Sequence, residues 1–150
     1  MNERKNSSRK KLVLVVEDNP TNVVLLEGLL SKNGYKIGTA LDANQAFEFV
    51  KKELPDLILL DVMMPGMNGF EVCEELKSNV KTKHIPVIFL TAKTATEDIV
   101  KGFKVGGVDY ITKPYKKEEL IARVSTHIEI STLRSLLPIC SSCKKIRNDE

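Results

Sequence analysis

The fold of this chain is decided by a stretch that reads LILLD over residues 57–61 and VMMPGMNG over residues 62–69. Four aliphatic side chains in a row favour a short strand that is buried on both faces, as in a parallel sheet covered by helices. The strand ends in a carboxylate, Asp61, and the Pro- and Gly-containing loop leads to a helical pattern from Phe70 onward. This stretch therefore predicts one unit of strand, loop and helix.

The same unit recurs on both sides of this stretch. Strands are expected over residues 12–16, 36–40, 57–60, 87–90 and 110–112, each followed by a helical pattern. In the first unit, Asn19 can cap the helix and Pro20 fits its first turn. Five such units are too few for an eight-fold barrel and predict an α/β fold with an open, doubly wound parallel sheet.

The last helix is expected to begin near Lys117, with Leu120, Val124 and Ile128 on one face. A helix of roughly 18 to 20 residues would be about 30 Å long and would extend beyond the edge of a small domain. Two interpretations stay open: the end of this helix pairs with another copy in a homodimer, or it frays after Ile130.

Composition excludes several classes of protein. The chain has 150 residues, of which 42% are hydrophobic and 29% charged, which is typical of one compact domain and not of a disordered or collagen-like chain. Its net charge of +3 lies at the ends: residues 1–11 carry +4 and residues 140–150 carry +1, which leaves −2 for residues 12–139. A basic start rich in Asn and Ser is typical of a solvated tail. With no Trp and 5% aromatic residues, we expect no direct binding of nucleic acid.

Hydropathy and cysteine content predict the compartment. The longest early apolar run, residues 12–16, is shorter than a signal-peptide core or a membrane span. An odd number of cysteines, three, does not make a disulfide framework, and Cys73 is expected to be a partly buried thiol in a helix. We therefore expect a cytoplasmic protein with no membrane insertion.

Polar side chains follow the predicted strands at their carboxyl ends, where open α/β sheets bind ligands. They are Glu17, Asp18, Asp61, Thr91 and Lys113. Three carboxylates in one crevice repel one another unless a hard cation such as Mg²⁺ neutralises them. A carboxylate beside Mg²⁺, a hydroxyl and an ammonium group can attack phosphorus and form an acyl phosphate. Each residue alone is more often a turn former, a backbone hydrogen-bond partner or a solvated charge; only the combination predicts a site.

A resemblance to a known family rests on four stretches: Glu17-Asp18-Asn19, residues 57–69, Thr91-Ala92 and Lys113-Pro114. Together they resemble the CheY-like receiver domain of bacterial two-component response regulators. The spacings agree: 43 residues separate Asp18 from Asp61, 30 separate Asp61 from Thr91, and 22 separate Thr91 from Lys113. The resemblance implies a receiver domain over residues 11–132, with a flavodoxin-like sheet in the order 2-1-3-4-5. The composition of the start of the chain, for its part, predicts a basic disordered tail over residues 1–10.

The resemblance also implies the roles of the site residues. Asp61 would be the phosphoacceptor, and Mg²⁺ would be held by Asp18, Asp61 and the Met63 carbonyl, with Glu17 acting through water. Thr91 and Lys113 would bind the phosphoryl group, and Tyr110 would swing inward as Thr91 closes on it. A cis bond is expected between Lys113 and Pro114. Glu17 departs from the more frequent Asp, and Met63 and Lys93 would border the phosphoryl group.

This resemblance predicts a signalling domain that takes its phosphoryl group from a histidine kinase or a phosphotransfer protein. It would catalyse only its own phosphorylation and dephosphorylation. A Mg²⁺-dependent phosphohydrolase of the haloacid dehalogenase type is the alternative, but that family uses a second acid two residues after the nucleophile, where this chain has Met63. Flavodoxin-like cofactor binding is disfavoured because the first loop lacks a Gly-rich phosphate cradle.

Residues 133–150 are expected to form a helix extension and a cysteine-containing tail. Cys140 and Cys143 have metal-ligand spacing, but zinc needs two more ligands, and His84 and His127 belong to the receiver. The stretch resembles a Leu-Pro-Ile-Cys-x-x-Cys segment of bacterial signalling proteins in which a second cysteine pair follows. We therefore expect a truncated, reduced and disordered tail, with zinc shared across a dimer as the alternative.

Overall fold

The computed structural model describes residues 9–92 and 96–136. Within them, strands and helices alternate along the chain. The strands are β1 (Leu12–Val16), β2 (Lys36–Ala40), β3 (Leu57–Asp61), β4 (Val87–Thr91) and β5 (Asp109–Thr112). The helices are α2 (Pro20–Lys32), α3 (Ala43–Lys52), α4 (Gly69–Lys77), α5 (Thr96–Lys104) and α6 (Lys117–Leu136). The five predicted units are all present, to within a residue or two at their ends.

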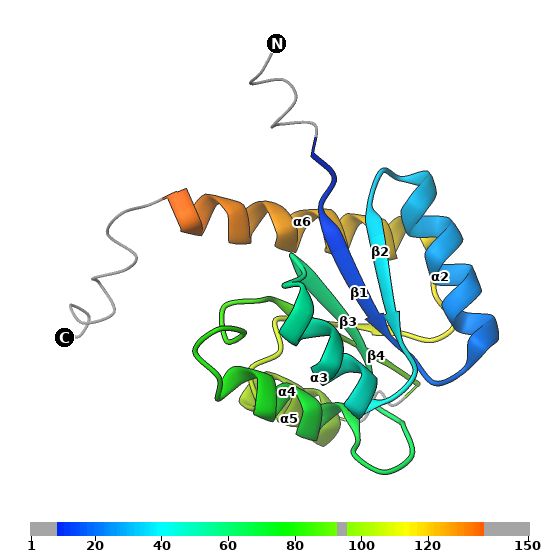
Figure 1. Cartoon of the computed structure of the whole chain (residues 1–150). Coiled ribbons are helices and arrows are strands. Elements are labelled where there is room, and N and C mark those ends of the chain that lie inside the picture. The colour runs from blue at the N-terminus through cyan, green and yellow to red at the C-terminus, as the bar shows by residue number, and fades with distance from the viewer. Residues whose placement is uncertain (1–8, 93–95, 137–150) are drawn as a thin grey trace.

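The strands form one parallel sheet in the order β2-β1-β3-β4-β5, which confirms the predicted flavodoxin-like topology (Figure 1). Val16 lies opposite Leu60, and Thr91 lies opposite Thr112. Because all strands run the same way, their carboxyl ends meet at one edge. The residues that follow β1, β3, β4 and β5 are therefore neighbours in space.

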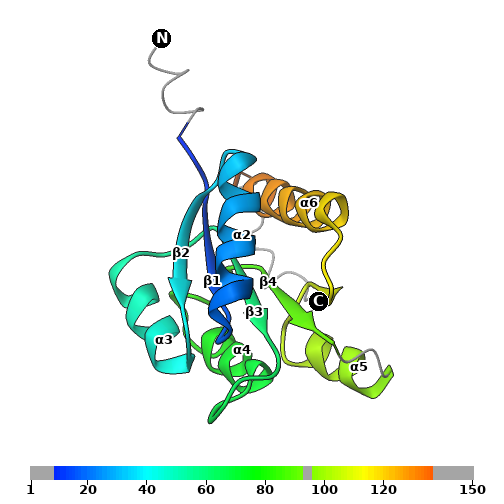
Figure 2. The same ribbon diagram turned by 90° about the vertical axis from the view of Figure 1, so that its right-hand side faces the viewer.

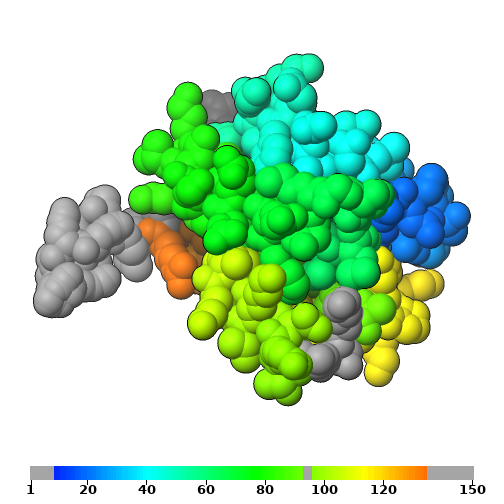
Figure 3. All heavy atoms as spheres, turned by 90° about the horizontal axis from the view of Figure 1, so that it is seen from below, coloured from blue at the N-terminus to red at the C-terminus, as the bar shows by residue number. Residues whose placement is uncertain are grey.

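The helices cover both faces of the sheet (Figures 1 and 2). Leu14 and Val16 pack with the core that includes α3 and α4, whereas Val13 and Val15 pack with the core that includes α2 and α6. This alternation follows from the period of two along a strand, with both faces buried. Seen from below, α3, α4 and α5 form one continuous surface (Figure 3).

Local signals position the loops around the carboxyl edge. The Asn19 side chain caps α2 by accepting hydrogen bonds from the backbone N–H groups of Thr21 and Asn22, and Pro20 occupies the first turn, as predicted. The peptide bond between Lys113 and Pro114 is cis, also as predicted. Cys73 is fully buried, deeper than the sequence suggested, because α4 packs it toward the carbonyl of Val105.

α6 has the predicted length of 20 residues, or about 30 Å, and its inner face packs Leu120, Val124 and Ile128 on the sheet. It continues past residue 132 to Leu136, so the predicted helix extension is present over residues 133–136. Within the described residues, no helix is both long and apolar enough to cross a membrane. The basic residues 1–8, Lys93, and the tail with Cys140 and Cys143 lie outside the described residues.

Candidate functional site

Three carboxylates gather at the carboxyl edge of the sheet. Glu17 and Asp18 directly follow β1, and Asp61 ends the neighbouring strand β3. One oxygen from each of the three lies within 4.8 Å of the others. Glu17 and Asp61 are 0% and 2% exposed, whereas Asp18 is open to solvent. The structure thus brings together the acidic residues that the sequence predicted, with one of them accessible from outside.

Lys113 joins this cluster from the far side of the site, directly after β5. Its Nζ lies 3.1 Å from Asp61 Oδ2 and 3.3 Å from Glu17 Oε1. The backbone also holds it, because the Lys113 N–H donates to the Thr91 carbonyl at 2.9 Å. Burial works against the ammonium, but the attraction of Asp61 and Glu17 outweighs it and raises the pKa of Lys113. The lysine is therefore a permanent positive charge shared by two carboxylates.

One lysine does not neutralise the cluster. Burial, together with the hydrogen bond and charge of Glu17, raises the pKa of Asp61 to about 7. Burial also acts to raise the pKa of Glu17, but its hydrogen bond with Asp61 and the charge of Lys113 lower it on balance. Near neutral pH, Asp61 is consequently protonated in part of the molecules. A metal cation that binds its carboxylate would displace this proton. Clustered carboxylate oxygens with surplus negative charge suit a hard divalent cation such as Mg²⁺.

Backbone groups orient the two buried carboxylates. Met63 donates its N–H to Asp61 Oδ1 at 3.2 Å, and Asn19 donates its N–H to Glu17 Oε2 at 3.2 Å. The loop after β3 then returns to its own start, since Gly69 donates its N–H to the Val62 carbonyl at 3.0 Å. A Cβ on Gly69 would lie 2.3 Å from the Asp61 carbonyl oxygen, so only glycine allows this approach.

Tyr115 is a site residue that the sequence reasoning missed. Its hydroxyl donates to Glu17 Oε1 at 3.3 Å, across 98 positions of sequence. Its place two residues after Lys113, beyond the cis Pro114, was the available signal, but an aromatic residue there is equally compatible with plain packing. Only the tertiary contact identifies it as part of the site.

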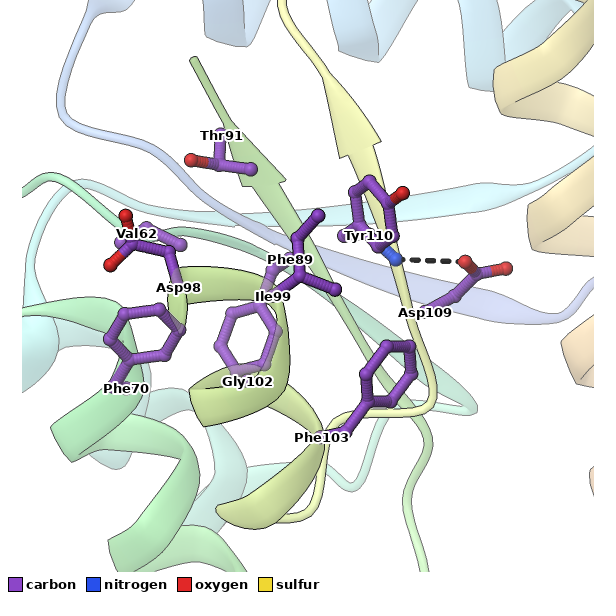
Figure 4. A pocket seen from close by; sticks show the side chains of 10 residues that line it. All are labelled: Val62, Phe70, Phe89, Thr91, Asp98, Ile99, Gly102, Phe103, Asp109 and Tyr110. Carbon is purple, nitrogen blue, oxygen red and sulfur yellow. Dashed lines mark hydrogen bonds between the residues drawn. The ribbon is translucent and has the colours of Figure 1, made fainter. Parts of the chain in front are cut away.

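Thr91 and Tyr110 lie on the neighbouring strands β4 and β5 and border one pocket (Figure 4). Thr91 is buried at the carboxyl end of β4, between the ends of β3 and β5. The Tyr110 ring meets Phe103 of α5 edge to face, with ring centroids 6.4 Å apart. The pocket is narrow, with room for about one water molecule, and is lined by Phe89 and Ile99 among others. The Tyr110 ring could therefore enter this space only if the side chains that line it moved.

The fold and the site define a class of protein, and comparison with known families agrees. The family model described as the response regulator receiver domain matches residues 13–125. The chain belongs to the response regulator receiver domain family. Members of this family typically accept a phosphoryl group, which receiver domains take from histidine kinases or phosphotransfer proteins.

Individual relatives support the assignment. Response regulator PleD of Caulobacter vibrioides is 46% identical over 112 residues, which make up 75% of this chain and 25% of PleD. The chain thus spans about a quarter of the length of that curated relative. Chemotaxis protein CheY4 of Vibrio cholerae is 30% identical with a TM-score of 0.75, and the match covers 78% of this chain and 98% of CheY4.

A further solved relative bears on the acidic cluster. The receiver domain of sensor histidine kinase PA1611 from Pseudomonas aeruginosa, solved with a magnesium ion coordinated in its active-site cleft, is 30% identical. Its TM-score is 0.74, and the match covers 80% of this chain and 98% of that domain. The flavodoxin-like fold is thus shared with a relative that binds Mg²⁺.

Proposed function

We propose that Asp61 accepts a phosphoryl group from a phosphohistidine of a histidine kinase or a phosphotransfer protein. The observation that carries this proposal is the pairing of buried Asp61 with Lys113 at 3.1 Å, beside two further carboxylates. An Asp61 oxygen attacks phosphorus, the bond from phosphorus to the histidine nitrogen breaks, and the nitrogen keeps the electron pair. The products are an acyl phosphate on Asp61 and a neutral imidazole, because the phosphohistidine ring reacts with a proton on its other nitrogen and keeps that proton.

Three carboxylates would hold Mg²⁺ in this step: Asp18 and Asp61 directly and Glu17 through water, together with the predicted Met63 carbonyl. Mg²⁺ supplies positive charge for the oxygens of the transferring group. Lys113 lies next to the attacking carboxylate and pairs with one of these oxygens once the group arrives. Thr91, at the end of the strand between β3 and β5, donates its hydroxyl to another.

Phosphorylation would then change the face made by α5 and β5. Thr91 moves toward the phosphoryl group, and Tyr110 turns toward the pocket that both residues border as the side chains that line it, such as Ile99, make room. The altered face signals to a partner or to a fused output. On this proposal the domain is a switch and not an enzyme with outside substrates. A homodimer through α6 and a cytoplasmic location stay predictions from the sequence.

The phosphohydrolase alternative gains no support from the contacts of Asp61. Met63 stands where that chemistry uses a second acid, its side chain is exposed, and its thioether cannot transfer a proton. The hydrogen bond that joins Met63 to Asp61 comes from its backbone N–H and not from its side chain. Rapid turnover on outside substrates is therefore not expected.

The test is phosphorylation of the whole chain by a small acyl phosphate donor with Mg²⁺, followed by intact mass measurement. The wild type should gain the mass of one phosphoryl group, and Asp61→Asn should gain none. Asp109→Asn is the matched control, because it changes a half-buried carboxylate outside the cluster, and it should behave like the wild type. Phosphate release without any accumulated mass gain would favour the phosphohydrolase. An equal mass gain in Asp61→Asn would overturn the assignment of Asp61.

A further inference from the structure

We infer that Tyr115 is a positioning residue of this site: its hydroxyl holds the Glu17 carboxylate in place, together with Lys113 before phosphorylation and without it once Lys113 turns to the phosphoryl group. The inference rests on the proposed phosphoacceptor function. Tyr115 helps this chain to accommodate a glutamate at position 17. It takes part in no bond-forming step of the reaction.

Glu17 is a buried carboxylate on a longer arm than aspartate. The additional torsion means that its carboxylate needs more contacts to stay in one orientation. Besides its hydrogen bond with Asp61, three donors provide them: the Asn19 N–H at Oε2, and both Tyr115 and Lys113 at Oε1. The Oε1 atom is therefore held by one neutral donor and one charged donor, both at 3.3 Å.

The two donors at Oε1 differ in what happens to them during phosphorylation. Lys113 also contacts Asp61, at 3.1 Å, and the arriving phosphoryl group competes for its ammonium. Tyr115 contacts Glu17 and carries no charge that the phosphoryl group could attract. The Tyr115 side chain is a neutral phenol, so its hydroxyl stays a donor. Tyr115 thus secures Oε1 after Lys113 has turned away.

Tyr115 is well fixed for this purpose. Its ring packs against the core between the sheet and the helices α2 and α6, and its hydroxyl reaches the carboxyl edge. The segment that carries it connects β5 to α6 directly after Lys113. The same short segment therefore carries both donors to Glu17 Oε1. Lys113 turns to the phosphoryl group during the reaction, whereas Tyr115 stays in place.

The test begins with the affinity of the full chain for Mg²⁺ alone, measured by calorimetric titration. Tyr115→Phe keeps the ring and removes only the hydroxyl, and we expect Mg²⁺ to bind about threefold to tenfold more weakly. Tyr35→Phe is the matched control, because it removes the hydroxyl of another half-buried tyrosine, which interacts with Ser125 away from the cluster. That variant should bind Mg²⁺ like the wild type.

A double-mutant cycle separates positioning from general packing. Glu17→Asp withdraws the carboxylate by one methylene, out of reach of Tyr115, so adding Tyr115→Phe to it should change the Mg²⁺ affinity no further. An equal loss in both backgrounds would overturn the inference, as would an unchanged affinity of the single variant. Failure of the proposed function has a different signature: the wild type itself would neither bind Mg²⁺ nor gain a phosphoryl group.

The rate of phosphorylation supplies a second readout. With Mg²⁺ saturating for each protein, Tyr115→Phe should still be phosphorylated more slowly than the wild type, because Glu17 loses its anchor when Lys113 moves. In the Glu17→Asp background the same substitution should leave the rate unchanged. A slower rate in both backgrounds would assign Tyr115 a packing role only.

Discussion

Two clusters of charged side chains in this domain contain a buried or half-buried aspartate with a cationic partner, yet the pKa of Asp109 is lowered and that of Asp61 is raised. At the start of β5, Arg123 Nη1 donates to both oxygens of Asp109, at 2.9 and 2.8 Å, and His127 Nε2 lies 3.0 Å from Oδ2. Burial acts to raise the pKa of Asp109, but these partners and the Tyr110 N–H lower it.

At the carboxyl edge the balance is reversed. Asp61 and Glu17 share the single ammonium of Lys113, and burial with the repulsion of Glu17 raises the pKa of Asp61 to about 7. The Asp109 cluster is internally satisfied and ties β5 to α6. The Asp61 cluster keeps surplus negative charge, which a structure tolerates where a cation and a reacting group are to bind.

The largest expected effect comes from removing Lys113, the cation that the described part of the chain brings to the Asp61 cluster. Lys113→Met leaves Asp61 and Glu17 buried without a counter-charge, and we expect it to lower the free energy of unfolding by about 3 kcal/mol at pH 8. The loss should be smaller at pH 5, below the pKa of about 7, where Asp61 is protonated. Urea unfolding at both pH values measures this. Lys51→Met is the control, because Lys51 makes only an exposed pair with Glu48; an equal loss at both pH values would contradict the prediction.

The approach of Gly69 to Asp61 predicts the next effect. Gly69→Ala places a Cβ 2.3 Å from the Asp61 carbonyl oxygen, so the backbone must shift at a cost of about 2 kcal/mol. The shift should also weaken Mg²⁺ binding, since it displaces a ligand. Gly28→Ala in α2, where nothing lies within 4 Å, should be neutral or stabilising. Thermal unfolding and Mg²⁺ titration compare the two variants, and similar results for both would refute the argument.

The proton on Asp61 predicts how Mg²⁺ affinity depends on pH. The pKa of about 7 means that Mg²⁺ competes with a proton below neutral pH and not above it. We expect the apparent affinity to fall by about tenfold between pH 8 and pH 6. Calorimetric titration in buffers of different ionisation enthalpy should also detect proton release at pH 6. In Asp61→Asn the residual affinity should be nearly independent of pH over this range, and a retained pH dependence would point to another group.

A substitution in the Asp109 cluster is expected to have the smallest effect. The pKa of Asp109 is lowered in the folded state, so its stabilisation is present above its unfolded value of 3.8 and is lost as the pH falls through the folded value. Asp109→Asn should therefore cost about 1 kcal/mol at pH 7 and progressively less below pH 4. Urea unfolding across this range measures it. Mg²⁺ affinity should stay unchanged, and a change would mean that the two clusters are coupled.

The sequence reasoning predicted the strands and helices well, and it predicted which acidic residues would lie together with Lys113, for identifiable reasons. Residues 12–16 and 57–60 are apolar runs that only a doubly covered strand can bury, and the observed β1 and β3 begin and end where expected. Glu17, Asp18, Asp61 and Lys113 meet because parallel strands share a carboxyl edge. The roles assigned to them, and the closing motion of Thr91 and Tyr110, stay predictions that the experiments above test.

What the sequence by itself determined is the set of residues at the carboxyl edge, because strand length, polarity and order along the chain are local properties that periodicity records. What only the tertiary structure decided is which of these groups form hydrogen bonds and ion pairs with one another. The bond from Tyr115 to Glu17 spans 98 positions, and the pairing of Asp109 with Arg123 and His127 joins β5 to one face of α6. Such contacts depend on rotamers and on how a helix packs on the sheet, which no local pattern encodes. The charge that is left uncompensated at Asp61, on which its proposed phosphorylation depends, follows from that packing.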